Sequence, residues 1–280
     1  MKLHSFNIVN FKVDGGAMFG VVPRLLWSKH IPPDEDNLIP LSLRSLVIET
    51  DKRVVLIDNG IGDKQGKKFM NRLNMFGGEG LKEGLARGNY SPDAISDVIL
   101  THLHFDHCGG GIRKDTSGAF IPTFPNAKYW VSRIQWENAV NPNPREADSF
   151  LQENIIPMKD CGVLNFIEES GIFCEDIELL MVHGHTPGQL LPLIDLGTKK
   201  LLFGGDLFPT RAHVPVKYNM AYDLEVLKTM TEKENYLAEI ADKPTAIFFE
   251  HDVDVECGLV SNTQKGYKIT STFTLKEWLS

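Results

Sequence analysis

Residues 101–110 read Thr-His-Leu-His-Phe-Asp-His-Cys-Gly-Gly, the most informative stretch of the chain. His102 and His104 are two positions apart, so in an extended backbone their side chains lie on one side. Asp106 and His107 follow where a glycine pair lets the chain turn. Imidazole and carboxylate groups together suit Zn, and also Fe, Mn, Co or Ni. The stretch therefore predicts a metal site, and its ligands can exceed what one tetrahedral ion needs.

Three later segments share one design, in which an apolar, strand-like run is followed by a single candidate ligand. His185 lies in the turn His-Gly-His-Thr-Pro-Gly, Asp206 follows Leu-Leu-Phe-Gly-Gly, and His251 follows Ile-Phe-Phe-Glu. A rigid scaffold presents a site in this way, on the loops at the ends of its strands. Each of these residues is weak evidence alone, but together with the first stretch they predict one shared metal centre.

This constellation resembles the metallo-β-lactamase superfamily over nearly the whole chain. The resemblance implies two metal ions, with seven ligands: His102, His104 and His185 on the first ion, Asp106, His107 and His251 on the second, and Asp206 bridging both. It also implies that Asp58, after Val-Val-Leu-Ile, is structural support near the site. Asp106 and Asp206 are the expected catalytic carboxylates. The expected cofactors are two divalent ions per chain, zinc first, with iron, manganese or cobalt as alternatives.

Two further segments narrow the resemblance to one branch. Residues 14–23, Asp-Gly-Gly-Ala-Met-Phe-Gly-Val-Val-Pro, and the Phe-Phe-Glu-His-Asp ending look like the quorum-quenching N-acyl-homoserine-type lactonases and the neighbouring methyl-parathion-hydrolase-like enzymes. Two metals can share a water and lower its pKa from 15.7 toward about 7. The resemblance thus implies an enzyme, a dinuclear metal-dependent hydrolase that opens a small ester-like substrate, a lactone first, with a metal-bridging hydroxide.

One departure from the branch bears on the substrate. Lactonases of this branch often carry a tyrosine soon after the bridging aspartate, whereas Asp206 is followed here by Leu-Phe-Pro-Thr. Tyr218, Tyr222 and His213 are candidates to replace that phenol. The apolar segment 18–27 reads either as a buried entry strand or as a wall for an acyl or aromatic group. The expected substrate-binding residues are Met18, Phe19, Trp27, Phe208, Tyr218 and Tyr222.

Composition bounds the remaining possibilities. The 280 residues carry a net charge of −8, which argues against a nucleic-acid surface, and no stretch approaches the roughly 18 apolar residues of a membrane span. The four cysteines show no metal-type or disulfide-type spacing, and Cys108 reads as a packing residue beside the ligands. We therefore expect a cytoplasmic protein with a small-molecule substrate and no nucleic-acid or membrane partner. A homodimer is compatible with the sequence.

The order of elements predicts an α/β fold, a single domain over residues 1–280. Hairpin strands are expected at 45–50 and 54–58, and further strands at 127–132, 177–182, 190–195, 201–204 and 245–249. Helices are expected from Ser91-Pro92, over 133–140 and over 223–241, with an insertion of short helical pieces at 62–90 and an irregular segment at 141–165. This order fits an αββα sandwich, two mixed sheets flanked by helices.

The sequence is compatible with other functions. A phosphotriesterase or arylesterase of the same fold would use the same ligands. A mononuclear iron dioxygenase of sulfur metabolism would lack several ligands of the second ion, which this chain keeps. A nuclease shares the His-x-His-x-Asp-His string, but it would need a basic face, and the chain is acidic overall.

Overall fold

The computed structural model describes residues 1–280, which divide into two compact units. The first unit contains Met1–Phe11 and Ser42–Glu169, and the second contains Lys12–Leu41 and Ser170–Ser280. Each unit is built on one mixed β-sheet with helices, so the predicted α/β class with two mixed sheets is confirmed. The prediction of one domain over the whole chain stays a prediction. No helix is long and apolar enough to cross a membrane.

The first sheet has six strands in the order β1-β2-β3-β4-β7-β8. Their bounds are Lys2–Asp14 (β1), Leu38–Glu49 (β2), Val54–Ile57 (β3), Asp97–Ile99 (β4), Lys128–Ser132 (β7) and Leu164–Ile167 (β8). β2 and β3 form the predicted hairpin, while β3 and β4 run parallel. The carboxyl ends of β3 and β4 therefore lie at one edge of the sheet, where Asp58 and the segment after Ile99 begin.

Short helices and a small hairpin accompany this sheet. They are α3 (Lys67–Arg72), α4 (Leu81–Arg87), α5 (Phe105–Cys108), α6 (Arg133–Val140), α7 (Gln152–Asp160), the 3₁₀ turns η1 (Pro92–Ala94), η2 (Gly109–Gly111) and η3 (Ala147–Ser149), and the hairpin β5 (Ile112–Lys114) with β6 (Phe120–Pro122). α6 begins where predicted, with Ser132 accepting a bond from the Gln135 amide. The expectation that 141–165 is irregular was wrong, because α7 lies inside it. The predicted helix after Ser91 is only a 3₁₀ turn, without a side-chain cap.

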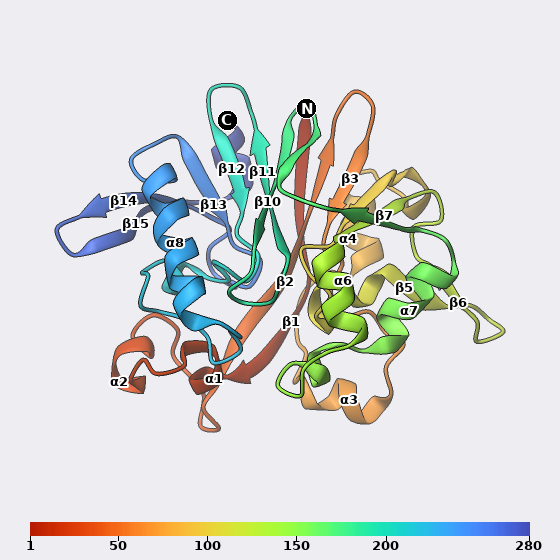
Figure 1. The fold of residues 1–280 in the computed structure, drawn as a ribbon, viewed down its shortest axis with the longest axis horizontal. Helices are drawn as coiled ribbons and strands as arrows, with labels where there is room; N and C mark the ends of the chain where they lie inside the picture. The colour runs from red at the N-terminus through yellow and green to blue at the C-terminus, as the bar shows by residue number, and fades with distance from the viewer. The chain divides into compact units, whose positions relative to one another are not determined.

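The second sheet has seven strands in the order β15-β14-β13-β12-β11-β10-β9 (Figure 1). Their bounds are Gly171–Cys174 (β9), Ile177–Val182 (β10), Gln189–Asp195 (β11), Lys200–Phe203 (β12), Thr245–Phe248 (β13), Cys257–Thr263 (β14) and Gly266–Phe273 (β15). β12 is parallel to β13 and antiparallel to β11, which is antiparallel to β10. β10, β12 and β13 therefore all end at the same edge.

The helices of the second unit are α1 (Gly15–Phe19), α2 (Arg24–Trp27), α8 (Val226–Ile240) and α9 (Leu275–Leu279), with the 3₁₀ turn η4 (Arg211–His213). Leu237 and Ile240 of α8 join a buried cluster with Leu202 and Ile247 of the sheet, so this helix covers one sheet face (Figure 1). The entry strand considered for 18–27 is wrong, because the segment forms α1 and α2.

Candidate metal centre

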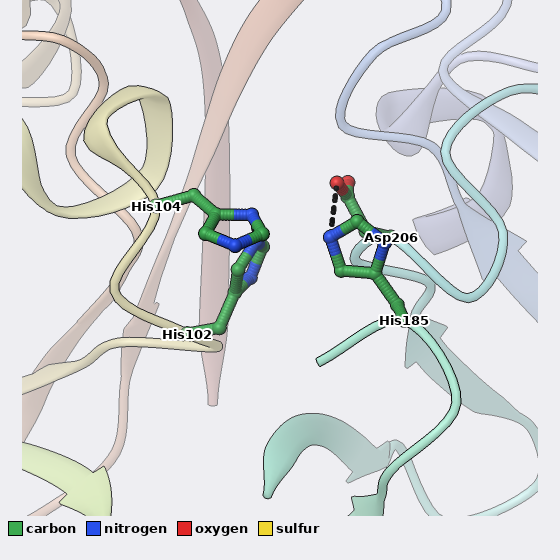
Figure 2. A group of neighbouring side chains, drawn as sticks. All are labelled: His102, His104, His185 and Asp206. Atoms are coloured by element: carbon green, nitrogen blue, oxygen red, sulfur yellow. Dashed lines mark hydrogen bonds and ion pairs between the residues drawn. The ribbon is translucent and has the colours of Figure 1, made fainter. Parts of the chain in front are cut away.

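The first unit brings four of the predicted ligands into one loop. β4 ends at Ile99, and the chain continues through His102 and His104 into α5, which carries Asp106 and His107. Figure 2 shows the rings of His102 and His104 next to each other. Their centroids are 4.4 Å apart and their planes are nearly perpendicular. His102 and His107 have centroids 3.9 Å apart. All three rings are buried or nearly so.

The turn after His107 depends on glycine. A Cβ atom on Gly109 would collide with the carbonyl group of Ile61, and one on Gly110 with the carbonyl oxygen of Asn59. The backbone of this turn thus packs directly against the loop that follows β3. Residues 59–61 and the ligand loop are held together by this close approach, and the Gly110 amide donates to the Gly60 carbonyl at 3.0 Å.

Asp58 supports two of the ligand histidines. It is fully buried, with φ at 51°, a left-handed backbone that residues other than glycine rarely adopt. Its Oδ2 accepts from the Thr101 hydroxyl at 2.6 Å and lies 3.0 Å from Nδ1 of His107. Because that hydroxyl proton goes to Asp58, the Thr101 oxygen accepts from Nδ1–H of His102 at 3.1 Å.

Glu146, which the sequence did not mark, supports the third histidine. Its Oε1 lies 2.9 Å from Nε2 of His104, and its Oε2 accepts from the side-chain amide of Asn138 at 2.8 Å. Glu146 is only 4% exposed, so this pair is removed from water. A carboxylate on the far nitrogen of a histidine sets the tautomer and raises the basicity of the near nitrogen.

These contacts test whether a cation fits between His102 and His104. With Nδ1 of His102 and Nε2 of His104 both donating, the remaining nitrogens carry lone pairs, and they face each other at 3.0 Å. Two facing lone pairs repel unless a cation lies between them. Two nitrogen ligands of a tetrahedral zinc ion are roughly 3.3 Å apart. The donor set of the first unit therefore fits a metal ion.

The second unit brings together the other three ligands, from the ends of β10, β12 and β13. Nε2 of His185 lies 3.1 Å from Oδ2 of Asp206, the ion pair drawn in Figure 2. Nε2 of His251 lies 3.0 Å from Oδ1 of the same carboxylate. One aspartate thus presents each oxygen to a different histidine, and all three residues are at most 8% exposed. This is the arrangement expected of a bridging ligand.

Asp206 and His185 are held from behind by buried polar groups. Oδ1 of Asp223 lies 3.0 Å from Nδ1 of His185, which leaves Nε2 of that ring for a metal. The buried side chain of Gln189, with its oxygen turned toward the loop, accepts from the Asp206 amide at 2.8 Å and the Leu207 amide at 3.3 Å. Asp223 was assigned to a helix from the sequence, but α8 begins only at Val226.

The loops of Asp206 and His251 are also tied to each other. The His251 amide donates to the Pro209 carbonyl at 3.0 Å. The Arg211 guanidinium donates to Asp252 at 2.6 Å and to Asp254 at 3.1 Å. These bonds hold the segment after Asp206 against the segment after His251. They therefore fix the positions of the two predicted ligands relative to each other.

The expected substrate-binding residues fall into two groups. Met18, Phe19, Trp27 and Phe208 are at most 3% exposed, whereas Tyr218 is half-buried and Tyr222 is 45% exposed. Phe19 stacks on Trp27 at 5.1 Å and on His213 at 4.6 Å between ring centroids. Phe208 belongs to the buried cluster under α8. The burial of these aromatic rings is that of core packing, and their contact with a substrate stays a prediction.

His213 is not available to replace the missing phenol. Its Nδ1 lies 2.8 Å from the Thr210 hydroxyl and its Nε2 lies 2.8 Å from the Met18 carbonyl oxygen, so both ring nitrogens are engaged. Burial lowers the pKa of this imidazole to about 3, so the ring is neutral. Of the three candidates, only Tyr218 and Tyr222 keep accessible side chains.

Cys108 behaves as expected of a packing residue. It is fully buried, and its thiol donates to the Leu103 carbonyl at 3.3 Å. Burial raises the pKa of the thiol to about 12, so no thiolate forms near neutral pH.

Comparison with known proteins identifies the family of this chain. The model of the metallo-β-lactamase superfamily matches residues 40–251, more than half of the chain. The chain belongs to the metallo-β-lactamase superfamily. It is a metal-dependent hydrolase of that superfamily.

Individual members of the superfamily match over most of their length. An N-acyl homoserine lactonase of a Bacillus species is 28% identical over 242 residues, which cover 79% of this chain and 86% of that protein. A structure of a probable metal-dependent hydrolase from Staphylococcus aureus superposes with a TM-score of 0.88 at 30% identity, covering 98% of this chain and 96% of the other. A dizinc quorum-quenching lactonase with a bound product, N-hexanoyl-L-homoserine, superposes with a TM-score of 0.76 at 20% identity, covering 98% and 97%. The last likeness concerns the fold alone.

Proposed function

We propose that this chain is a dinuclear metal-dependent hydrolase that opens the ester bond of a small lactone, such as an acyl-homoserine lactone. The observation that carries the proposal is the Asp206 carboxylate, whose two oxygens face His185 and His251 separately at 3.1 and 3.0 Å. A carboxylate presented in this way would be able to contact two ions. The proposed ions are zinc, and the proposed ligands are His102, His104, Asp106, His107, His185, Asp206 and His251.

When bound, such a pair of ions would polarise the substrate carbonyl and lower the pKa of a nearby water toward about 7. The side chains supply the rest of the chemistry. Asp58, Glu146 and Asp223 hold the ligand rings in one tautomer, so that no reorganisation is needed during the reaction. Asp206 would fix the spacing of the ions and accept the proton that the attacking water loses.

Ester cleavage also requires a proton for the departing alkoxide. We propose that Asp106 passes to the alkoxide oxygen, as the ester C–O bond breaks, the proton that Asp206 accepts from the attacking water. The carboxylate of Asp106 is 15% exposed and its Oδ2 lies 3.7 Å from Nε2 of His107, so it is the most accessible of the carboxylates among the ligands. No serine or cysteine nucleophile takes part, since the thiol nearest the site is buried and protonated.

A lactone is the proposed substrate because relatives at 26 to 28% identity are named N-acyl homoserine lactonases. One observation favours a second candidate, a phosphotriesterase or arylesterase. The residues after Asp206 are Leu207, Phe208, Pro209 and Thr210, and none of them offers a phenol. A site without that phenol would have a weaker preference for a lactone carbonyl over other ester-like groups.

Hydrolysis rates on a matched panel test the proposal. The panel contains acyl-homoserine lactones of two chain lengths, an aryl ester, a phosphotriester and a β-lactam, assayed with the zinc-loaded protein. A kcat/KM for a lactone that exceeds the others supports the lactonase, because this ratio measures which transition state the site stabilises. The highest ratio on the phosphotriester or aryl ester would select the second candidate. No hydrolysis of any member by protein with bound zinc would overturn both.

A further inference from the structure

A buried lysine is hydrogen-bonded to the loop that precedes α8. Lys233 of α8 is 1% exposed, and burying an ammonium group among apolar residues is costly unless it is hydrogen-bonded. The buried stripe of α8 runs through Thr229, Lys233, Leu237 and Ile240, so the lysine stands where the amphipathic pattern calls for an apolar residue. Methionine would fill this position at lower cost. The polar amine at this position therefore points to a role other than packing.

The contacts of Lys233 indicate what that role is. Its Nζ donates to the Tyr218 carbonyl at 2.6 Å and to Oδ1 of Asn219 at 3.2 Å. It also lies 6.0 Å from the centroid of the Phe208 ring, two residues after Asp206. The lysine thus fastens the loop that runs from the end of η4 to the start of α8.

This loop carries the carboxylate that orients His185. Directly after Asn219, the Met220 amide donates to Oδ2 of Asp223 at 3.1 Å, and Oδ1 of Asp223 lies 3.0 Å from Nδ1 of His185. The Leu224 amide donates to the His185 carbonyl at 3.1 Å. From the other side, Glu232, the residue before Lys233, accepts from the Gly184 amide at 2.9 Å. Hydrogen bonds and adjacent residues therefore connect Asn219 through Asp223 to His185.

We propose that Lys233 is a positioning residue of the metal centre, which anchors residues 218–219 so that Asp223 holds His185 in its ligand geometry. The inference rests on the proposed metal centre. It assigns part of the zinc affinity to a helix residue that touches neither a ligand nor the metal.

The test is a double-mutant cycle read out as zinc affinity and not as activity. The apoprotein, prepared with a chelator, is titrated with Zn²⁺ against a chromophoric competitor, and the thermal unfolding of each apoprotein is recorded. The variants are K233M, D223N, K233M/D223N and the matched control K228M, on the exposed side of the same helix. Loss of a group that orients a ligand typically weakens metal binding by about 10- to 100-fold.

The expected result is that K233M and D223N each weaken the binding of Zn²⁺ about 10-fold or more, that the double variant binds no more weakly than D223N, and that K228M matches the wild type. A structural role alone would lower the Tm of K233M and leave its zinc affinity unchanged, which overturns the proposal. Multiplying effects in the double variant would also overturn it. If K233M gives no cooperative unfolding, K233Q replaces it, since the amide keeps one donor.

The two proposals fail in different ways. A weakened D223N beside an unchanged K233M removes the role of Lys233 and leaves the metal centre intact. A wild-type protein that takes up no Zn²⁺ overturns the metal centre and the positioning role together.

Discussion

Oε1 of Glu146 lies 2.9 Å from Nε2 of His104, and both side chains are buried. The two residues are 42 positions apart, and no motif connects them. The contact fixes which nitrogen of His104 is left for a metal. It also ties a segment between α6 and α7 to the ligand loop, where the ring of Phe150 packs 5.0 Å from that of His104.

The first prediction concerns this contact. E146Q should weaken zinc binding by about 10- to 100-fold. The neutral amide oxygen of glutamine accepts a weaker hydrogen bond from Nε2–H of His104 than a carboxylate does, so it raises the basicity of the other ring nitrogen less. Chelator competition on the apoprotein measures it. E168Q is the matched control, since Glu168 pairs with Arg133 at the surface. Equal zinc affinity for E146Q and E168Q would show that Glu146 does not support the ligand.

The second prediction concerns metal stoichiometry. The wild type should bind about two metal ions per chain, and D206N should lose at least one of them together with nearly all hydrolysis. The reason is that the two oxygens of Asp206 face two different histidines. Elemental analysis after gel filtration gives the ratio, with D195N, at an exposed carboxylate, as the control. A stable content of one iron per chain, with oxygen uptake, would contradict the hydrolase.

The third prediction concerns Cys108. C108S should keep its metal content and most of its turnover, because a thiol with a pKa of about 12 supplies no nucleophile at neutral pH. Serine can still donate to the Leu103 carbonyl, as the thiol does. Steady-state kinetics and elemental analysis on the same sample measure both properties. If turnover vanished while metal content and Tm were retained, the mechanism would have to include the sulfur.

The fourth prediction uses the pKa of Lys233. Burial lowers it from 10.5 to about 7, so between these values the unfolded chain holds a proton that the folded chain has released. The free energy of unfolding therefore rises with pH over this range, and K233M lacks this contribution. The stability difference between wild type and K233M should shift in favour of the wild type by up to about 1.4 kcal/mol per pH unit. Urea unfolding from neutral to alkaline pH measures it, and a constant difference would refute it.

The fifth prediction separates packing from substrate contact at Phe19. This ring is fully buried between Trp27 and His213, so F19A should lower the free energy of unfolding by about 3–5 kcal/mol. Urea unfolding of the apoprotein provides the value. Kinetics on lactones of increasing acyl length are measured alongside. An unchanged stability with a flattened dependence on chain length would instead support the substrate contact predicted from the sequence.

Local sequence patterns predicted the elements whose own residues specify a strand or a helix. The pairing of β2 with β3 was predicted, although β2 begins seven residues before the expected range of 45–50. The start of α6 at Arg133 and the strands β10 to β13 agree with the expected ranges to within a residue or two. The same patterns gave wrong predictions where contacts with residues distant in the sequence stabilise short helical turns. A buried strand was one of the two interpretations of segment 18–27, but Trp27 packs against Phe19 and over Gly15, which stabilises two turns of helix. α8 lost its expected first turn because Asp223 is bound to His185.

The sequence by itself determined that this protein is a metal-dependent hydrolase, since the predicted ligands stand at strand ends in a spacing that few other functions use. Only the tertiary structure decided what holds those ligands. Asp58, Glu146, Asp223 and Lys233 come from loops and a helix far from the residues that they support. The physical reason is that a ligand must lie beside its ion, and strand ends place it there locally. A supporting carboxylate or ammonium group needs only a buried partner within hydrogen-bond reach, and any segment that folds to that spot can supply it.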